Sequence, residues 1–305
     1  MAEAIGQENG ELWQLYNGDC CELITELPDE SVGYSIFSPP FVSLFVYSDS
    51  ERDMGNCGDS DEFFQHFGFL IRELYRVLKP GRLCSVHCMN MPSLKAHDGF
   101  IGVKDFRGDI IRAFQSDGFI YHSEVCIWKD PVVAMQRTKA LGLLHKQVCK
   151  DSSMSRQAIP DYICTFRKPD KNTEPIEGPF DYFAGEGFEN TGNFSIDVWQ
   201  RYASPVWMDI RQSNTLNAAE GRSEKDERHV CPLQLDVIHR CCQLWSNEGD
   251  VVLSPFAGIG SEGVGALKLG RRFVGFELKE EYFRVACKNL RVAESEALAP
   301  SLFEG

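Results

Sequence analysis

The stretch VVLSPFAGIGSEG, residues 251–263, combines a short apolar run, a glycine-rich turn and the start of a helix. Gly258 and Gly260 allow the backbone to come close to a ligand, because glycine has no Cβ atom. A second apolar run at 272–277 ends on Glu277. A carboxylate there can accept hydrogen bonds from both hydroxyls of a ribose. We therefore expect this unit to bind an adenosine-type cofactor.

The turn alone does not identify the cofactor. It also fits the G-x-G-x-x-G pattern of dinucleotide binding, so an NAD-dependent oxidoreductase stays an alternative, as does a purely structural turn. Glu262 weakly disfavours NAD, because a carboxylate repels a pyrophosphate, whereas a cofactor with a positive sulfonium tolerates acid nearby. The sequence also lacks an obvious catalytic histidine or tyrosine–lysine pair for hydride transfer.

Strand and helix patterns alternate on both sides of a long polar stretch. Before it, apolar spacing predicts strands at 12–17, 33–37, 83–88 and 121–128 and helices at 61–78 and 106–115. After it, the spacing predicts helices at 233–244, 262–269 and 279–290 and strands at 250–254 and 272–277. Strands alternating with helices indicate an α/β fold with a doubly wound, Rossmann-like and mostly parallel sheet.

The same patterns divide the chain into four parts. Residues 13–128 and 229–292 are the N-terminal and C-terminal parts of the α/β domain, and 293–305 form a tail. Residues 129–228 are polar and show little periodicity. A stretch this long is rarely a plain connection in a compact domain. We therefore expect an inserted region with a function of its own.

Charge is distributed unevenly along the 305 residues. The formal net charge of −14 argues against a nucleic-acid partner for the molecule as a whole. Residues 129–168, however, contain eight Lys/Arg and three Asp, a local balance of +5. An acidic protein with one basic stretch can still bind DNA through that stretch. For a DNA partner, we would expect the contacts at Arg137, Lys139, Lys146, Lys150 and Arg156.

Composition sets further expectations. No run of 18 apolar residues occurs, so no membrane-spanning helix is predicted. The N-terminus resembles no secretory signal, and we expect a cytoplasmic protein. The twelve cysteines are scattered and form no C-x-x-C pair, which favours reduced thiols and predicts no metal site.

A proline turn at Ser38, Pro39, Pro40 and Phe41 follows the strand predicted at 33–37. Consecutive prolines fix φ and remove two N–H donors, so this turn presents a hydroxyl and carbonyl oxygens. The Ser38 side chain and the Pro39 carbonyl can accept both hydrogens of a planar amino group, and Phe41 can stack on the attached ring. The simpler alternative is a loop that contains prolines.

Together, the proline turn, the Phe-x-Gly-x-Gly turn at 256–260 and the acidic strand end at Glu277 resemble the amino-methyltransferases of DNA. The proline turn comes first and the cofactor turn last, which resembles the permuted class called beta. The resemblance covers 13–292 and implies a Rossmann-like methyltransferase sheet with a target-recognition region at 129–228. It also implies S-adenosyl-L-methionine as the cofactor and double-stranded DNA as the partner.

The resemblance assigns roles to individual residues. It implies a catalytic target-base pocket of Ser38, Pro39, Pro40 and Phe41, and a cofactor site of Asp19, Ser254, Phe256, Gly258, Gly260 and Glu277. Ser254 stands where the family usually has Asp, and Cys231 stands where it usually has a Lys before proline. We interpret His87 as a histidine of the strand core.

The resemblance further implies that the target base is flipped out of the duplex and methylated on its exocyclic amino group without a covalent enzyme intermediate. The sequence favours adenine N6 and leaves cytosine N4 as the alternative. An RNA or protein amide methyltransferase is a more distant alternative. The recognition sequence, the choice between monomer and homodimer, and the choice between an orphan enzyme and a restriction–modification partner stay open.

Overall fold

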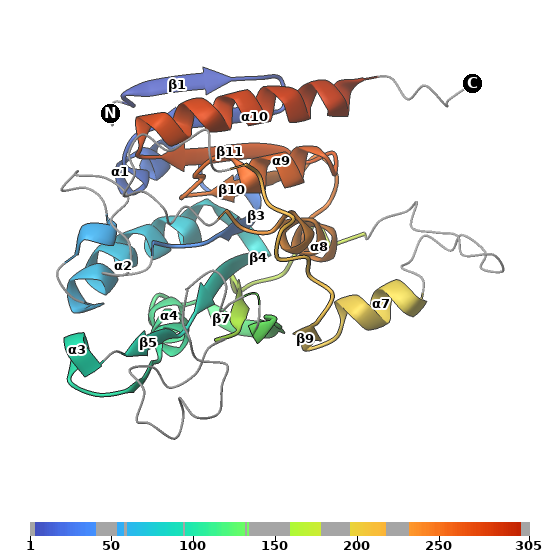
Figure 1. Ribbon diagram of the computed structural model, residues 1–305. Helices are drawn as coiled ribbons and strands as arrows, with labels where there is room; N and C mark the ends of the chain where they lie inside the picture. The colour runs from blue at the N-terminus through green and yellow to red at the C-terminus, as the bar shows by residue number, and fades with distance from the viewer. Residues whose placement is uncertain are drawn as a thin grey trace.

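The computed structural model describes residues 4–40, 54–57, 60–93, 95–131, 133, 159–177, 196–217 and 232–299. A nine-stranded sheet of order β1-β2-β11-β10-β3-β4-β8-β7-β9 forms its centre (Figure 1). Five neighbouring strands run parallel: β2 (Trp13–Asn17), β11 (Arg272–Glu277), β10 (Val251–Ser254), β3 (Val32–Phe37) and β4 (Leu78–Met89). The expected mostly parallel α/β sheet is confirmed.

The edges of the sheet depart from the parallel pattern. At one edge, β1 (Gly6–Asn9) pairs antiparallel with β2. At the other, β8 (Asp161–Arg167) lies antiparallel between β4 and β7 (Ile120–Ile127), and β9 (Val206–Trp207) runs parallel to β7. Because β8 and β9 come from the polar stretch 129–228, part of that stretch completes the sheet.

Helices cover both faces of the sheet (Figure 1). The helices α1 (Cys20–Leu23), α2 (Ser60–Val77) and α4 (Phe106–Ser116) share one hydrophobic cluster, and α8 (Leu235–Trp245), α9 (Ser261–Leu267) and α10 (Glu280–Leu298) pack on the opposite face. Five of these six follow the predicted helices closely. Smaller elements are α3 (Lys95–Asp98), α7 (Ile196–Tyr202), two 3-10 turns at Ile24–Glu26 and Met54–Asn56, and the hairpin of β5 (Met91–Ser93) and β6 (Gly102–Lys104).

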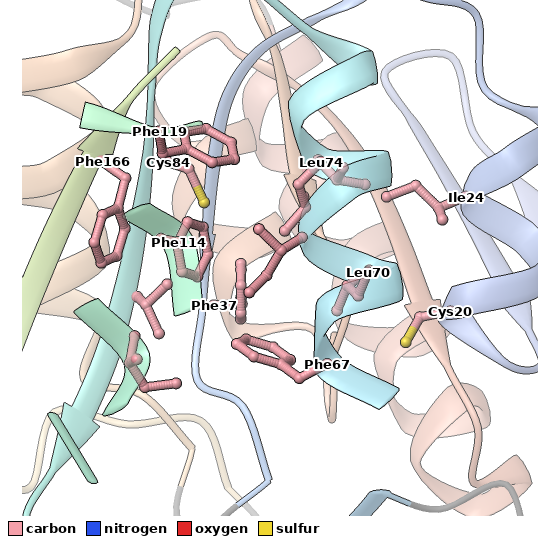
Figure 2. Close-up of a cluster of buried hydrophobic side chains, with 14 of the residues drawn as sticks. Cys20, Ile24, Phe37, Phe67, Leu70, Leu74, Cys84, Phe114, Phe119 and Phe166 are labelled. Carbon is pink, nitrogen blue, oxygen red and sulfur yellow. The ribbon is translucent and has the colours of Figure 1, made fainter. Parts of the chain in front are cut away.

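The apolar face of α2 anchors the middle of the sheet. Figure 2 shows Phe67, Leu70 and Leu74 on this helix beside Phe37 at the end of β3. All four side chains are fully buried, and the Phe37 and Phe67 rings meet edge-on with centroids 6.4 Å apart. Burying one such side chain stabilises the fold by about 1.5–3 kcal/mol. This packing fixes the residue that immediately precedes the proline turn.

Two boundaries differ from the predicted ones. Helix α10 continues to Leu298, so a helix occupies much of the segment expected as a tail. Helix α2 ends at Val77, and β4 begins at Leu78, ahead of the Lys-Pro-Gly sequence expected to separate them. Among the described helices, none is both long and apolar enough to span a membrane.

Candidate active site

The carboxyl ends of the parallel strands bring the two predicted turns together. Strands β3 and β10 are neighbours, with Tyr34 opposite Val252 and Ser35 opposite Leu253. Since both strands run in the same direction, the proline turn after β3 and the glycine turn after β10 leave the sheet side by side. Phe37, the last residue of β3, packs against Phe256 of the glycine turn, with ring centroids 5.7 Å apart. Open α/β sheets bind ligands at such strand ends.

The glycine turn has backbone angles that suit glycine. Gly258 has φ of 53° and Gly260 has φ of 88°. A Cβ atom on Gly258 would have no atom within 4 Å, so the space above this residue is open, whereas one on Gly260 would lie 3.3 Å from Ala286. The first glycine therefore leaves room for a ligand, and the second allows close packing against α10.

Glu277 closes this turn from the end of β11. Its carboxylate accepts hydrogen bonds from the backbone N–H groups of Gly258, at 2.7 Å, and Lys279, at 2.9 Å. Each carboxylate oxygen has two lone pairs, so capacity for ribose hydroxyls remains. The backbone of Gly18 donates to the Glu277 carbonyl at 3.0 Å, which places Asp19 at the next strand end. Asp19 caps α1 by accepting from the Cys21 N–H at 2.8 Å.

Buried polar atoms around the glycine turn lack partners within the described residues. The hydroxyls of Ser254, at the end of β10, and Ser261, at the start of α9, are both buried without a hydrogen bond. Buried polar groups are usually bonded, so each unsatisfied group needs an explanation. A polar ligand end, such as an amino-acid moiety, would satisfy them. The residues present therefore fit S-adenosyl-L-methionine.

Glu262 adds a buried acid to the same place. Its side chain is 4% exposed. The pKa of the Glu262 carboxyl is raised to about 8, chiefly by burial; a backbone hydrogen bond lowers this pKa, and the negative charge of Glu277 adds a smaller rise. A positively charged ligand would favour the ionised form. This supports the expectation that a cationic cofactor tolerates acid at this position.

A cluster of possible metal ligands lies nearby but does not suit a metal. Potential donor atoms of Asp19, Cys20 and Cys21 all lie within 4.8 Å of one another. The Asp19 carboxylate already caps α1. The hydrogen bond to Cys21 and burial raise the pKa of the Cys20 thiol well above its ordinary value, so the thiolate that metals require is disfavoured. We assign no metal to this cluster.

The proline turn lies partly within the described residues. Ser38 is half-buried, Pro39 and Pro40 are buried, and Phe41 lies outside the described part of the chain. The Ser38 Oγ atom lies 2.8 Å from His87 Nδ1 on β4. A histidine interpreted as core from the sequence is therefore hydrogen-bonded to the predicted catalytic serine.

Two more residues extend this contact. His87 Nε2 lies 3.3 Å from Asp161 Oδ2, at the start of β8, and Asp161 Oδ1 lies 2.5 Å from Lys129 Nζ. Nothing in the spacing of these residues signals the arrangement, because the three side chains come from β4, β8 and the segment after β7. Only the strand order brings them together.

The predicted DNA contacts cannot be placed. Arg137, Lys139, Lys146, Lys150 and Arg156 all lie outside the described residues. Of the two tryptophans in the adjoining region, Trp207 is buried and packs against the Arg240 guanidinium, while Trp199 is 52% exposed.

Comparison with known proteins identifies the family. A family model described as DNA methylase, N6_N4_Mtase, matches residues 32–288. The type II methyltransferase M.BamHI of Bacillus amyloliquefaciens is 27% identical over 279 residues, which cover 88% of this chain and 55% of that enzyme. The DNA adenine methyltransferase YhdJ of Escherichia coli is 46% identical over 67 residues, 22% of this chain and 23% of that protein. The chain thus spans about half the length of the first of these relatives.

Two solved structures share the fold. The putative DNA modification methylase TTHA0409 of Thermus thermophilus, complexed with S-adenosyl-L-methionine, aligns with TM-score 0.63 and 21% identity over 92% of this chain and 95% of its own. The cytosine-N4-specific PvuII DNA methyltransferase aligns with TM-score 0.63 and 16% identity over 97% and 96%. The family model, which spans most of the chain, decides against the dehydrogenase alternative: the protein belongs to the N6/N4 DNA methylase family.

Proposed function

We propose that the chain transfers a methyl group from S-adenosyl-L-methionine to the exocyclic amino nitrogen of adenine in duplex DNA. One observation carries this proposal: the turn of Ser38, Pro39 and Pro40 and the turn of Gly258 and Gly260 emerge from adjacent parallel strands. If the amino-group pocket and the cofactor pocket lie on two adjacent strands, the amine nitrogen and the methyl group of the cofactor would come into contact. Such positioning supplies much of the catalysis in group transfer.

The cofactor would be held by residues at three strand ends, those of β10, β11 and β2. The open backbone at Gly258 and Gly260, the hydroxyl of Ser254 and the Phe256 ring would surround its methionine part, while Glu277 would accept the ribose hydroxyls and Asp19 would lie near the adenine. Bound S-adenosyl-L-methionine would supply an electrophilic methyl group. Glu262 would add negative charge near the positive sulfonium.

The proline turn would prepare the nucleophile. The exocyclic amine of a base is a poor nucleophile, because its lone pair is delocalised into the ring. Ser38 Oγ and the Pro39 carbonyl would each accept one amine hydrogen and draw the nitrogen toward tetrahedral geometry. Forming the nitrogen–methyl bond would break the carbon–sulfur bond of the cofactor, and the nitrogen would then release one hydrogen as a proton to solvent. Phe41 would stack on the flipped base, which is worth about 1–3 kcal/mol.

The substrate would be duplex DNA in the cytoplasm, bound with residues 129–228 as the target-recognition region. The basic residues Arg137, Lys139, Lys146, Lys150 and Arg156 would neutralise phosphates. Base flipping costs a few kcal/mol, which the pocket contacts would offset. Adenine is favoured by the likeness to an adenine methyltransferase over 67 residues, and the likeness to a cytosine-N4 enzyme keeps cytosine as the second candidate.

Nucleoside analysis tests the proposal. The protein is incubated with cofactor and DNA from a host that lacks methylation, and the DNA is digested to nucleosides for mass spectrometry. We expect N6-methyl-2′-deoxyadenosine as the new product. N4-methyl-2′-deoxycytidine would move the target to cytosine, and methylation confined to added RNA or to a protein amide would contradict the DNA assignment.

A further inference from the structure

A series of close polar contacts between side chains leads away from the predicted catalytic serine. Ser38 Oγ contacts His87 Nδ1 at 2.8 Å, His87 Nε2 faces Asp161 Oδ2 at 3.3 Å, and Lys129 Nζ lies 2.5 Å from Asp161 Oδ1. The exposed fraction is 9% for His87 and 3% for Asp161. A buried chain of this kind is costly unless each member is satisfied.

The sheet explains why these residues meet. Phe37 lies opposite Val86, so Ser38 follows β3 beside His87 on β4. Met89 lies opposite Asp161 in the antiparallel pairing of β4 with β8, which brings the start of β8 to the end of β4. The strand order therefore brings Ser38, His87 and Asp161 together at the strand ends that carry the proline turn.

The ionisation of Asp161 sets the direction of the hydrogen bonds. Burial raises the pKa of its carboxyl, but the contacts with His87 and Lys129 outweigh burial, so the pKa lies below its ordinary value. Asp161 is then a carboxylate and can only accept. Its Oδ2 atom faces His87 Nε2 at 3.3 Å and favours a proton on that nitrogen, and the tautomer with that proton leaves Nδ1 unprotonated toward Ser38.

On the basis of the proposed function, we infer that His87, oriented by Asp161, positions Ser38 for the target amine. The unprotonated Nδ1 accepts the single hydroxyl hydrogen of Ser38, so both lone pairs of Oγ face the amino group. If Nδ1 carried the proton, the Ser38 hydrogen would point toward the amine hydrogens and repel them. The carboxylate thus selects the histidine tautomer, as it does in a serine–histidine–aspartate triad.

Kinetics of four variants test this role. We expect His87→Leu and Asp161→Asn each to lower kcat by about tenfold or more, with unchanged KM for cofactor and DNA, because misplaced acceptors slow the chemical step. In the Ser38→Ala background, His87→Leu should have no further effect on kcat, because its influence passes through the hydroxyl. A full additional loss in the double variant, or an unchanged kcat in His87→Leu, would overturn the inference.

A matched control lies on the same face of the same strand. Ser85 is buried and its Oγ lies 2.9 Å from Thr165 Oγ1 on β8, so Ser85→Ala also removes a buried hydrogen bond between β4 and β8. We expect it to lower thermal stability but leave kcat unchanged. If Ser85→Ala lowers kcat as much as His87→Leu does, the effect of His87→Leu is structural and does not depend on Ser38.

A direct view of the tautomer separates this inference from the proposed function. Nitrogen-15 NMR of histidine-labelled protein should show the His87 proton on Nε2 and a bare Nδ1, and Asp161→Asn should shift the proton to Nδ1. A proton on Nδ1 in the parent protein would contradict the inference, whatever the activity. Absence of DNA methylation with the expected tautomer would count against the proposed function alone.

Discussion

At the residue scale, the site combines two acids with different environments. Glu277 is held by backbone N–H donors at the rim of the glycine turn, whereas Glu262 is buried beneath it. The difference assigns them different roles. Glu277 suits hydroxyl groups, and Glu262 suits a positive charge that would stabilise its ionised form.

The raised pKa of Glu262 predicts a pH-dependent stability difference. Below pH 4.5 the carboxyl is protonated in both states; between pH 4.5 and about 8 the unfolded chain releases the proton and the folded chain keeps it, so stability falls as pH rises. Glu262→Gln does not titrate. Without cofactor, we expect it to exceed the parent in free energy of unfolding by about 4 kcal/mol at pH 8, since each unit of pKa shift is worth about 1.4 kcal/mol.

Chemical denaturation at pH 5 and pH 8 measures this gap. The difference in free energy of unfolding between Glu262→Gln and the parent should be small at pH 5 and close to its full size at pH 8. Glu281→Gln, at an exposed glutamate of the same region, provides the control and should show no gap. If Glu262→Gln differs from the parent in free energy of unfolding by the same amount at both pH values, the assignment of a protonated buried acid is contradicted.

At the element scale, the parallel core and β7 match predicted strands, whereas β1, β8 and β9 were not predicted. The strand at 272–277 matches its prediction, since its apolar run is short and bounded by Gly270 and Glu277. Strand β8 was missed, because its residues Asp161–Arg167 mix polar and apolar types within a stretch of low periodicity. Because β8 was not predicted, the contact between His87 and Asp161 was not predicted either. A contact between β4 and β8 depends on strand order, which periodicity does not encode.

The glycine turn allows a matched test of its role. Gly258 and Gly249 both have positive φ, 53° and 76°, and a Cβ atom on either would meet nothing within 4 Å. Alanine in the left-handed region costs about 1–2 kcal/mol, so both alanine variants should lose similar stability. Only Gly258→Ala should weaken S-adenosyl-L-methionine binding, because its methyl group enters the proposed cofactor space.

Thermal unfolding and titration calorimetry separate the two effects. The Gly249→Ala variant should bind cofactor as the parent does. Equal cofactor affinity in both variants, at equal stability, would place the cofactor away from this turn.

At the scale of the whole molecule, a net charge of −14 must be reconciled with a DNA partner. We propose that DNA binds to the basic stretch within 129–168. Each phosphate contact contributes about −0.9 to the slope of log K against log salt. We expect charge reversal of Lys146, Lys150 and Arg156 together to weaken binding to all sequences and to make the slope less steep by about 3.

Filter binding across a salt series measures the slope. The control reverses three exposed cations elsewhere, Lys268, Arg272 and Lys288, on the α9–α10 side of the molecule. That variant should keep the parent slope. If both triple variants behave alike, net charge rather than the basic stretch governs binding.

The central claim is that the proline turn and the glycine turn form one methyl-transfer site. The rate of radiolabelled methyl transfer from S-adenosyl-L-methionine to DNA by Ser38→Ala tests it most directly, with cofactor affinity measured on the same sample. Loss of one acceptor for the amine should lower the rate by about tenfold or more while cofactor affinity stays unchanged. Transfer at the parent's rate would contradict the account and leave the proline turn a loop without a catalytic role.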